Sequence, residues 1–186
     1  MRRLLTWPSE LPGALDGLFT RVADASGAAE VVRLDHLSDA ASGAADEVLL
    51  AVPEAAVAGG ASPGEVLDGL RALGATDGPG VLLVVGDGYL GTDVRDLAAA
   101  SVGAAAVAAV RSLAVRRRGS RRANVVCVPE GLLGEAGDLR GPLRQPVELV
   151  DVVEAAAFLL GDGGRYLSGQ VLFVDGGRHL FSSMTA

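Results

Sequence analysis

A glycine-rich loop follows one of the most apolar runs of the sequence, Val81 to Val85, and reads Gly86-Asp87-Gly88-Tyr89-Leu90-Gly91. Glycines at this spacing, between a strand and a helix, allow close backbone approach to a pyrophosphate, so Gly86, Gly88 and Gly91 could bind a dinucleotide. Against this, the next acid at a strand end, Glu130, lies far beyond the usual spacing of about 20 residues. A glycine-rich turn after a buried strand is the simpler interpretation.

The other side chains that could do chemistry are few. Tyr89 has no basic neighbour, so the pKa of its phenol is expected to stay near the ordinary value of about 10. His36 and His179 are the only histidines and have no partners at ligand spacing, so neither a metal site nor a histidine catalyst is predicted. Cys127 stands alone, which excludes an internal disulfide and predicts a reducing, cytoplasmic location.

All 16 basic residues are arginine, so a mechanism that needs a lysine ammonium is excluded. Five arginines gather where a long predicted helix ends, and their charge there would offset the helix dipole. The simpler interpretation is a solvated helix end, and the alternative is a dock for an acidic acyl carrier protein or the phosphates of a coenzyme A thioester. The cluster comprises Arg116, Arg117, Arg118, Arg121 and Arg122.

Composition narrows the classes of partner. A formal net charge of −7 argues against nucleic acid, which binds clustered positive charge. The segment from Met1 to Trp7 meets Pro8 before any long apolar stretch, so no signal peptide or membrane span is expected there and the chain is predicted to be soluble. With 186 residues and no internal repeat, one domain over 1–186 is expected.

Short apolar runs alternate with helical patterns, which predicts a doubly wound α/β fold: a mostly parallel sheet between two helical layers. Helices are expected over 14–25, from Pro63 to Gly74 behind a Ser62–Glu65 capping box, over 94–118 behind Thr92 and Asp93, and over 146–161. The small-residue clusters at 40–45 and 56–64 are expected to be loops. Strands are expected at 3–6, 30–34, 47–52, 81–85, 123–128 and 170–174.

Two stretches carry a resemblance to a known family. Residues 146–179 read PVELVDVVEAAAFLLGDGGRYLSGQVLFVDGGRH, and Arg111-Ser112-Leu113-Ala114 lies upstream. This order resembles the carboxyl-terminal part of the short-chain dehydrogenase/reductase family, in particular the 3-oxoacyl-carrier-protein reductases, over roughly residues 46–180. The resemblance implies a Rossmann-like three-layer sandwich that is shortened in its amino-terminal, nucleotide-binding half.

When the chain is aligned with the family by these motifs, the family's catalytic residues are missing. The positions of its proton-donating tyrosine and of the lysine that supports it fall on Ala99 and Gly103, so no catalytic residue is predicted. After the first strand, Trp7-Pro8-Ser9-Glu10-Leu11-Pro12-Gly13 replaces the family's glycine-rich cofactor loop. One glycine, two prolines and a carboxylate make a poor phosphate cradle, so no cofactor is expected in this chain.

The surfaces through which the family assembles are better preserved. The resemblance places a subunit contact on the alanine-rich helix and another on the last strand and turn, although a monomer could bury the helix face against its own sheet. We therefore expect a non-catalytic subunit that pairs with an active ketoreductase holding NADP(H) or NAD(H), or with itself. The alternative is a divergent NAD(P)-dependent oxidoreductase. The predicted interface comprises Ala98, Val102, Ala105, Ala109, Ser112, Phe158, Gln170, Phe173, Asp175, Gly176 and Gly177.

Overall fold

The computed structural model describes residues 3–11, 15, 17–44, 47–76, 78–90, 96–117, 121–133 and 141–182. A six-stranded sheet lies at its centre, with the order β2-β1-β3-β4-β5-β6 and parallel pairing between all neighbours. The strands are β1 (Arg3–Trp7), β2 (Glu30–Arg33), β3 (Val48–Ala51), β4 (Gly80–Gly86), β5 (Ala123–Val128) and β6 (Val171–Phe173).

Each predicted strand is present, and its ends lie within one residue of the expected positions. Every residue of β4 and β5 is buried, because both faces of these central strands are covered, and this explains their unbroken apolar runs. The outer strand β6 is only partly buried along its length. The sequence signal is therefore strongest at the centre of the sheet.

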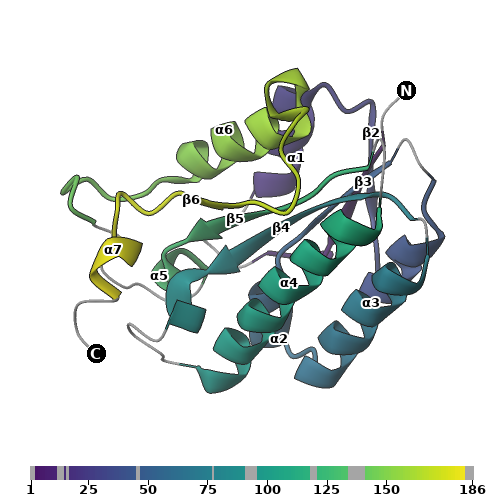
Figure 1. Ribbon diagram of the computed structural model, residues 1–186, viewed down its shortest axis with the longest axis horizontal. Helices are drawn as coiled ribbons and strands as arrows, with labels where there is room; N and C mark the ends of the chain where they lie inside the picture. The colour runs from purple at the N-terminus through teal and green to yellow at the C-terminus, as the bar shows by residue number, and fades with distance from the viewer. Residues whose placement is uncertain are drawn as a thin grey trace.

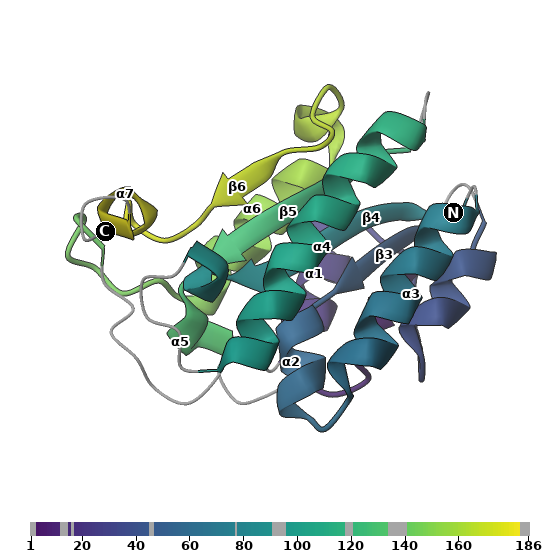
Figure 2. The same ribbon diagram turned by 60° about the horizontal axis from the view of Figure 1, so that its bottom comes forward.

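Helices cover both faces of the sheet, as Figure 1 shows. α1 (Leu18–Ser26) and α6 (Leu149–Leu160) pack on one face, and α2 (Pro53–Ala58), α3 (Pro63–Ala75) and α4 (Leu97–Arg116) pack on the other, which Figure 2 brings forward. This is the expected doubly wound, Rossmann-like sandwich. Among the strands of the described residues, β2 is the one that lies beyond β1.

α4 is the one helix in the described part of the chain whose length and composition would suit a membrane span. Its inner face contributes to the core beneath the sheet, and 44% of the apolar window is buried there. Core helices of soluble proteins have the same features, so we treat α4 as a core helix.

The start of α3 agrees with the prediction, whereas α1, α4 and α6 begin three or four residues later than expected, at Leu18, Leu97 and Leu149. The Ser62 hydroxyl accepts from the amide of Glu65 (3.2 Å), whose carboxylate accepts from the Ser62 amide (2.7 Å), as predicted for α3. α4 is capped instead by Asp96, which accepts from the amides of Ala98 and Ala99. The expected caps, Thr92 and Asp93, lie outside the described residues.

Two segments that were predicted to be loops contain helical turns. Residues 37–42 form the 3₁₀ helix η2 (Leu37–Ser42), and α2 occupies the start of the second segment. Pro53 at the first position of α2 presets a helical φ angle, and this local signal outweighs the weak apolar pattern of the segment. The remaining short helices are η3 (Asp87–Leu90), α5 (Glu130–Leu133), η4 (Asp162–Gly164) and α7 (His179–Ser182).

Two arginines at the end of α4 bind backbone carbonyls of the neighbouring helix α3. Arg117 is 4% exposed and donates to the carbonyl oxygens of Leu73 (2.8 Å) and Pro79. Arg116 donates to the carbonyl of Gly74 (3.2 Å). These guanidinium groups satisfy carbonyls that the end of α3 leaves without helical partners. The prediction of a solvated helix end is therefore wrong for Arg117.

Arg122 provides the corresponding contact on the other face of the sheet. Its guanidinium donates to the carbonyls of Leu159 (2.6 Å) and Leu160 (2.8 Å), at the end of α6. Arg121 is partly buried beside it, and Arg118 lies outside the described residues. The arginine cluster thus joins the ends of two helices on opposite faces of the sheet.

We predict that Arg117→Met lowers the free energy of unfolding by about 2–3 kcal/mol, because it leaves buried carbonyls without donors. Arg71→Met is the control, since Arg71 is exposed and its contact with Asp68 (3.4 Å) is a surface ion pair. Denaturant unfolding measures both. Equal, small losses in the two variants would contradict the buried role of Arg117.

Candidate functional site

A cavity of about 360 Å³ opens at the carboxyl ends of β4 and β5. Its walls come from α2, the end of β4, η3, the first turn of α4 with its cap Asp96, and α5. Ligand sites of open α/β sheets lie at this edge, because the loops that follow parallel strands meet there. The cavity is therefore the first candidate site of the molecule.

The two positions that the sequence resemblance aligned with a tyrosine and a lysine lie on α4 beside this cavity. Ala99 lines it, and Gly103 is buried one helical turn further on. A Cβ atom at Gly103 would collide with Oε1 of Glu54, so a lysine side chain cannot occupy this position while Glu54 keeps its place. Glycine inside a helix costs about 1 kcal/mol relative to alanine. At this position the missing Cβ of glycine leaves space for the carboxyl group of Glu54.

Glu54 is the residue of this site that the sequence did not reveal. It lies in the first turn of α2 and is buried. Oε1 accepts a hydrogen bond from the amide of Gly86 (2.9 Å), and Oε2 has no hydrogen-bond partner among the described residues. Burial, with a smaller contribution from the charge of Glu130, raises the pKa of Glu54 to about 8. The carboxyl group is therefore mostly protonated at pH 7.

Glu130 lies on the other side of the last residue of β4. A Cβ at Gly86 would lie 3.3 Å from the Cα of Glu130, and one at Gly88 would lie 2.8 Å from its carboxyl carbon. The two glycines of the loop thus leave space for this glutamate, as Gly103 does for Glu54. Two carboxyl groups therefore flank the end of β4, and both line the cavity.

Asp87 connects several segments next to this cavity. Its buried carboxylate accepts from the amide of Glu130 (2.8 Å) and pairs with the guanidinium of Arg178 (3.0 Å). It thereby ties β4, the start of α5 and the carboxyl-terminal turn to one another. Within the described residues no group of three or more His, Cys, Asp or Glu side chains could hold a metal ion.

Tyr89 is a weaker acid than the sequence predicts. Burial of the phenol and the neighbouring Cys127 thiol raise the pKa of Tyr89 above its ordinary value. The prediction of an unperturbed pKa is therefore wrong, because it considered only charged neighbours. Tyr89 does line the cavity, where its ring supplies apolar surface.

The glycine loop is a poor pyrophosphate cradle. The amide of Gly86 already donates to Glu54, and Gly88 faces the carboxyl group of Glu130. Gly91 lies outside the described residues. A pyrophosphate bound by this backbone would meet two carboxyl groups, so the geometry does not favour the dinucleotide interpretation of the loop.

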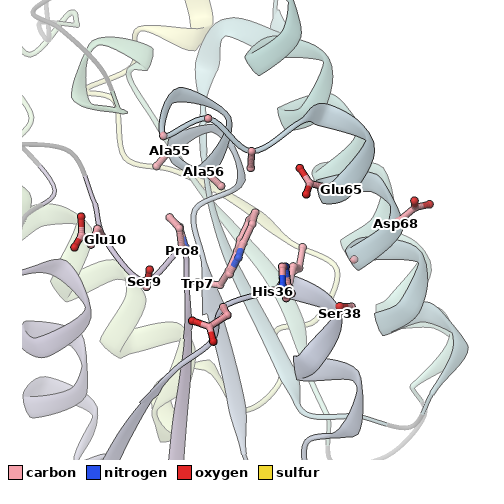
Figure 3. Close-up of a pocket in the computed structure, with 16 residues that line it drawn as sticks. Trp7, Pro8, Ser9, Glu10, His36, Ser38, Ala55, Ala56, Glu65 and Asp68 are labelled. Atoms are coloured by element: carbon pink, nitrogen blue, oxygen red, sulfur yellow. The ribbon is translucent and has the colours of Figure 1, made fainter.

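A second cavity, of about 570 Å³, lies where β1 and its neighbours end, at the point where the strand order reverses. Figure 3 shows the indole of Trp7 in the middle of the view, with Glu10 on one side and Glu65 on the other. Open α/β sheets bind dinucleotides at this position. The residues that line the cavity therefore decide whether a nicotinamide cofactor would fit there.

The described lining residues do not fit a dinucleotide. Trp7 and Pro8 stand where a glycine loop would approach the pyrophosphate, and His36 is the one lining residue of basic type in the part of the chain that the structure describes. Four carboxylates surround the space instead, and they would repel phosphate. These are Glu10, Asp35, Glu65 and Asp68.

The predicted interface on α4 needs one correction. Val102 is 1% exposed and belongs to the core, because it lies on the side of α4 that faces the sheet. Ala98 and Ser112 are exposed, and Ala105 and Ala109 are half-buried. The exposed residues along α4 form a different face of the helix from the predicted one. We call this exposed face the outer α4 stripe. It comprises Leu97, Ser101, Ala104, Ala108, Arg111 and Val115, all exposed.

The carboxyl-terminal part of the predicted interface is largely accessible. Phe158 is 48% exposed on α6, Gln170 is exposed, and Phe173 is half-buried on the edge strand β6. Leu180 and Phe181 add exposed apolar side chains on α7. Several apolar side chains of α6, β6 and α7 are therefore exposed or half-buried.

The Asp-Gly-Gly sequence forms a tight turn after β6. The buried carboxylate of Asp175 accepts from the amides of Gly177 (2.9 Å) and His179 (2.7 Å). Gly176 and Gly177 have φ angles of 61° and 86°, which only glycine adopts without strain. The His179 ring stacks on Phe173 at 4.0 Å between centroids. The interface role predicted for Asp175 is untested, and its carboxylate is occupied within the turn.

No family model matches the chain. A segment of 38 residues is 50% identical to 1-cyclohexenylcarbonyl-CoA reductase of Streptomyces collinus. This match spans 20% of the chain and 14% of that enzyme.

Solved structures are similar over nearly the whole chain. A short-chain dehydrogenase/reductase from Brucella melitensis has a TM-score of 0.66 at 14% identity and covers 95% of each chain. An enoyl-(acyl-carrier-protein) reductase from Anaplasma phagocytophilum, in complex with NAD, has a TM-score of 0.65 at 16% identity, over 96% of this chain and 94% of its own. An oxidoreductase from Burkholderia thailandensis has a TM-score of 0.65 at 19% identity, over 95% and 91%. At these identities the likeness concerns the fold.

We predict that Glu54→Gln weakens the dependence of stability on pH. Folded Glu54 keeps its proton up to about pH 8, whereas the unfolded chain loses it near the ordinary value of 4.5. Between these values the folded state holds more protons, so this residue lowers the free energy of unfolding as pH rises, by up to about 1.4 kcal/mol per pH unit. Glutamine removes that contribution.

Denaturant unfolding at pH 5 to 8.5 checks this prediction. Glu154→Gln, at an exposed position of α6, is the control and is expected to keep the wild-type slope. If Glu54→Gln and the wild-type protein lose stability in parallel as pH rises, Glu54 is not protonated in the folded state.

Proposed function

We propose, from the fold that this chain shares with short-chain dehydrogenases/reductases, that the protein is a non-catalytic subunit that assembles with an active ketoreductase of that family. One observation carries the proposal. The backbone at Gly103 is packed against the carboxyl group of Glu54, so a side chain at the position that the resemblance aligns with a lysine would displace Glu54. This packing supports a subunit without the family's chemistry.

The active subunit would hold the nicotinamide cofactor, NADP(H) or NAD(H). The acidic lining of the cavity at the strand-order reversal and the occupied amide of Gly86 support this division of roles. The partner's substrate would be a ketone bound to an acyl carrier protein or coenzyme A. The short match to a reductase of a coenzyme A thioester favours this class of substrate.

Two exposed surfaces support assembly. The outer α4 stripe carries small side chains between Leu97 (76% exposed) and Val115 (73% exposed), so a second helix could pack closely against it. The edge strand β6 and the exposed Phe158 provide the other surface. A homodimer would use the same surfaces, and a divergent oxidoreductase would need a cofactor site that the described residues do not favour.

We predict that the chain forms a stable complex with an intact ketoreductase encoded beside it. Size-exclusion chromatography with light scattering measures the mass of the mixture, and the rate of ketone reduction is measured in parallel. A mixed oligomer with altered activity is expected. A chain that stays monomeric and leaves the reductase unaffected would refute the proposal, and a homo-oligomer that excludes the reductase would favour the homodimer.

The variant Ala108→Glu tests whether the outer α4 stripe forms the contact with the reductase. A glutamate in the middle of the outer α4 stripe is expected to weaken the complex at least about tenfold, because its larger, charged side chain would keep a second helix from packing closely against the small residues there. Ala25→Glu, at an exposed position of α1 on the opposite face of the sheet, is the matched control and should assemble normally. If both variants assemble like the wild-type protein, the contact does not involve α4.

The chain alone is expected to show no affinity for NADH or NADPH. Calorimetric titration of each cofactor into the isolated chain checks this. A micromolar dissociation constant, about −8 kcal/mol, would instead support an oxidoreductase in its own right.

A further inference from the structure

We propose that the cavity at the ends of β4 and β5 binds a small uncharged amide, whose carbonyl oxygen accepts a hydrogen bond from the carboxyl group of Glu54. The ligand class goes beyond the proposed subunit role, and the isolated chain suffices to test it. Three observations support it: the hydrogen bonds of Glu54, its burial, and the other residues that line the cavity.

The two oxygens of the Glu54 carboxyl group have different surroundings. Oε1 accepts a hydrogen bond from the amide of Gly86 (2.9 Å), as the carbonyl oxygen of a neutral carboxyl group would. Oε2 is buried and has no hydrogen-bond partner among the described residues. The proton of a neutral Glu54 therefore belongs on Oε2, where it forms an O–H donor.

The surroundings of Glu54 favour this neutral form. The residue is 7% exposed, and an ionised carboxylate is costly to bury unless a cation accompanies it. The lining residues that the structure describes include no arginine or histidine, whereas Asp96 and Glu130 are acids. Burial, with a smaller contribution from the charge of Glu130, raises the pKa of Glu54 to about 8. The O–H donor is therefore present at neutral pH.

The position of this donor is fixed by the backbone. The hydrogen bond from Gly86 holds Oε1 at the end of β4, and on the α4 side the backbone of Gly103 packs against the same oxygen. Glu54 also belongs to the wall of the cavity. A ligand would thus meet a donor that is already oriented, so little ordering of the protein is needed on binding.

An uncharged amide fits the described wall. A buried O–H group is costly to leave without an acceptor, and an amide oxygen is a stronger acceptor than the oxygen of a ketone, an ester or an alcohol. The amide N–H can donate to the exposed carboxylate of Asp96, whose Oδ1 caps α4. The volume of about 360 Å³, with Leu133 and the ring of Tyr89 as apolar surface, suits a small molecule with one polar group.

Charged ligands are the less favoured occupants. A ligand carboxylate would enter a wall that carries Asp96 and Glu130, and these acids would repel it. An ammonium group would meet the proton of Glu54, and its binding there would require that proton to leave. An uncharged acceptor binds without either cost.

Binding is expected to follow the protonation of Glu54. Above about pH 8 the carboxyl group loses its proton, so the donor is lost and the affinity falls by up to about tenfold per pH unit. Burial raises the pKa values of the Cys127 thiol and the Tyr89 phenol, so both stay neutral in this range. Asp87 is paired with Arg178. The titratable groups around Glu54 are Glu130 at the start of α5, Cys127 on β5, Asp87 and Tyr89 on η3, and Asp96 at the start of α4.

Titration of ε-caprolactam into the full chain tests the proposal, with cycloheptanone and azepane as probes of the same ring size. The first carries an amide, the second only a carbonyl group, and the third is a cation at neutral pH. At pH 7, ε-caprolactam is expected to bind at least about threefold more tightly than cycloheptanone and at least about tenfold more tightly than azepane. The chemical shift of the Gly86 amide, which donates to Glu54, measures the affinity and locates the site.

Two variants separate the donor of Glu54 from its charge. Glu54→Gln keeps an N–H donor at the position of the O–H group, so it should bind ε-caprolactam with similar affinity and lose the decline above about pH 8. Glu54→Met removes the donor and should weaken binding at least about tenfold. Glu154→Gln, at an exposed position of α6, is the control and should match the wild-type protein at every pH. Thermal unfolding confirms that each variant is folded before titration.

Three results would overturn the inference. The first is no shift of the Gly86 amide when ε-caprolactam is added below about pH 8. The second is binding of cycloheptanone or azepane as tight as that of ε-caprolactam. The third is equal binding by the wild-type protein and Glu54→Met, which would exclude Glu54 as the donor.

Discussion

All strands of the sheet run in the same direction, so the segments that follow them gather along one edge. Along this edge, cavities and buried carboxyl groups interrupt the packing of apolar side chains. It holds both cavities, the buried acids Glu54 and Asp87, and the turn closed by Asp175. The opposite edge is held together by arginines that satisfy carbonyls at helix ends. The geometry of the parallel sheet therefore separates the edge that holds these cavities from the edge that is stabilised by arginine contacts.

The fold does not depend on the residue types at Ala99 and Gly103, the two positions of α4 that the sequence resemblance aligns with a tyrosine and a lysine. The core depends on apolar runs in β4 and β5, on helix faces and on capping contacts, and none of these requires a tyrosine and lysine on α4. Residues at those two positions could therefore change while the sandwich and its exposed surfaces persist.

The sequence predicted the strands well and the site poorly. Continuous apolar runs and the Ser62–Glu65 capping box are local signals that depend on few residues, and the corresponding elements are present. Glu54 was missed because α2 is short and lies in a segment rich in small residues, where periodicity carries little information. The Pro53-Glu54 pair at a helix start was the available signal. Its meaning depends on Gly103, which is distant in sequence and adjacent only in the folded chain.

The relation between Glu54 and Gly103 also restricts how this chain could evolve. A lysine at Gly103 would be excluded while Glu54 remains, and loss of Glu54 alone would leave an empty space beneath α4. The residues at these two positions are therefore coupled: a larger residue at Gly103 is expected to be tolerated only together with a smaller residue at Glu54. This coupling links two segments that are distant in sequence, so neither position can vary independently of the other.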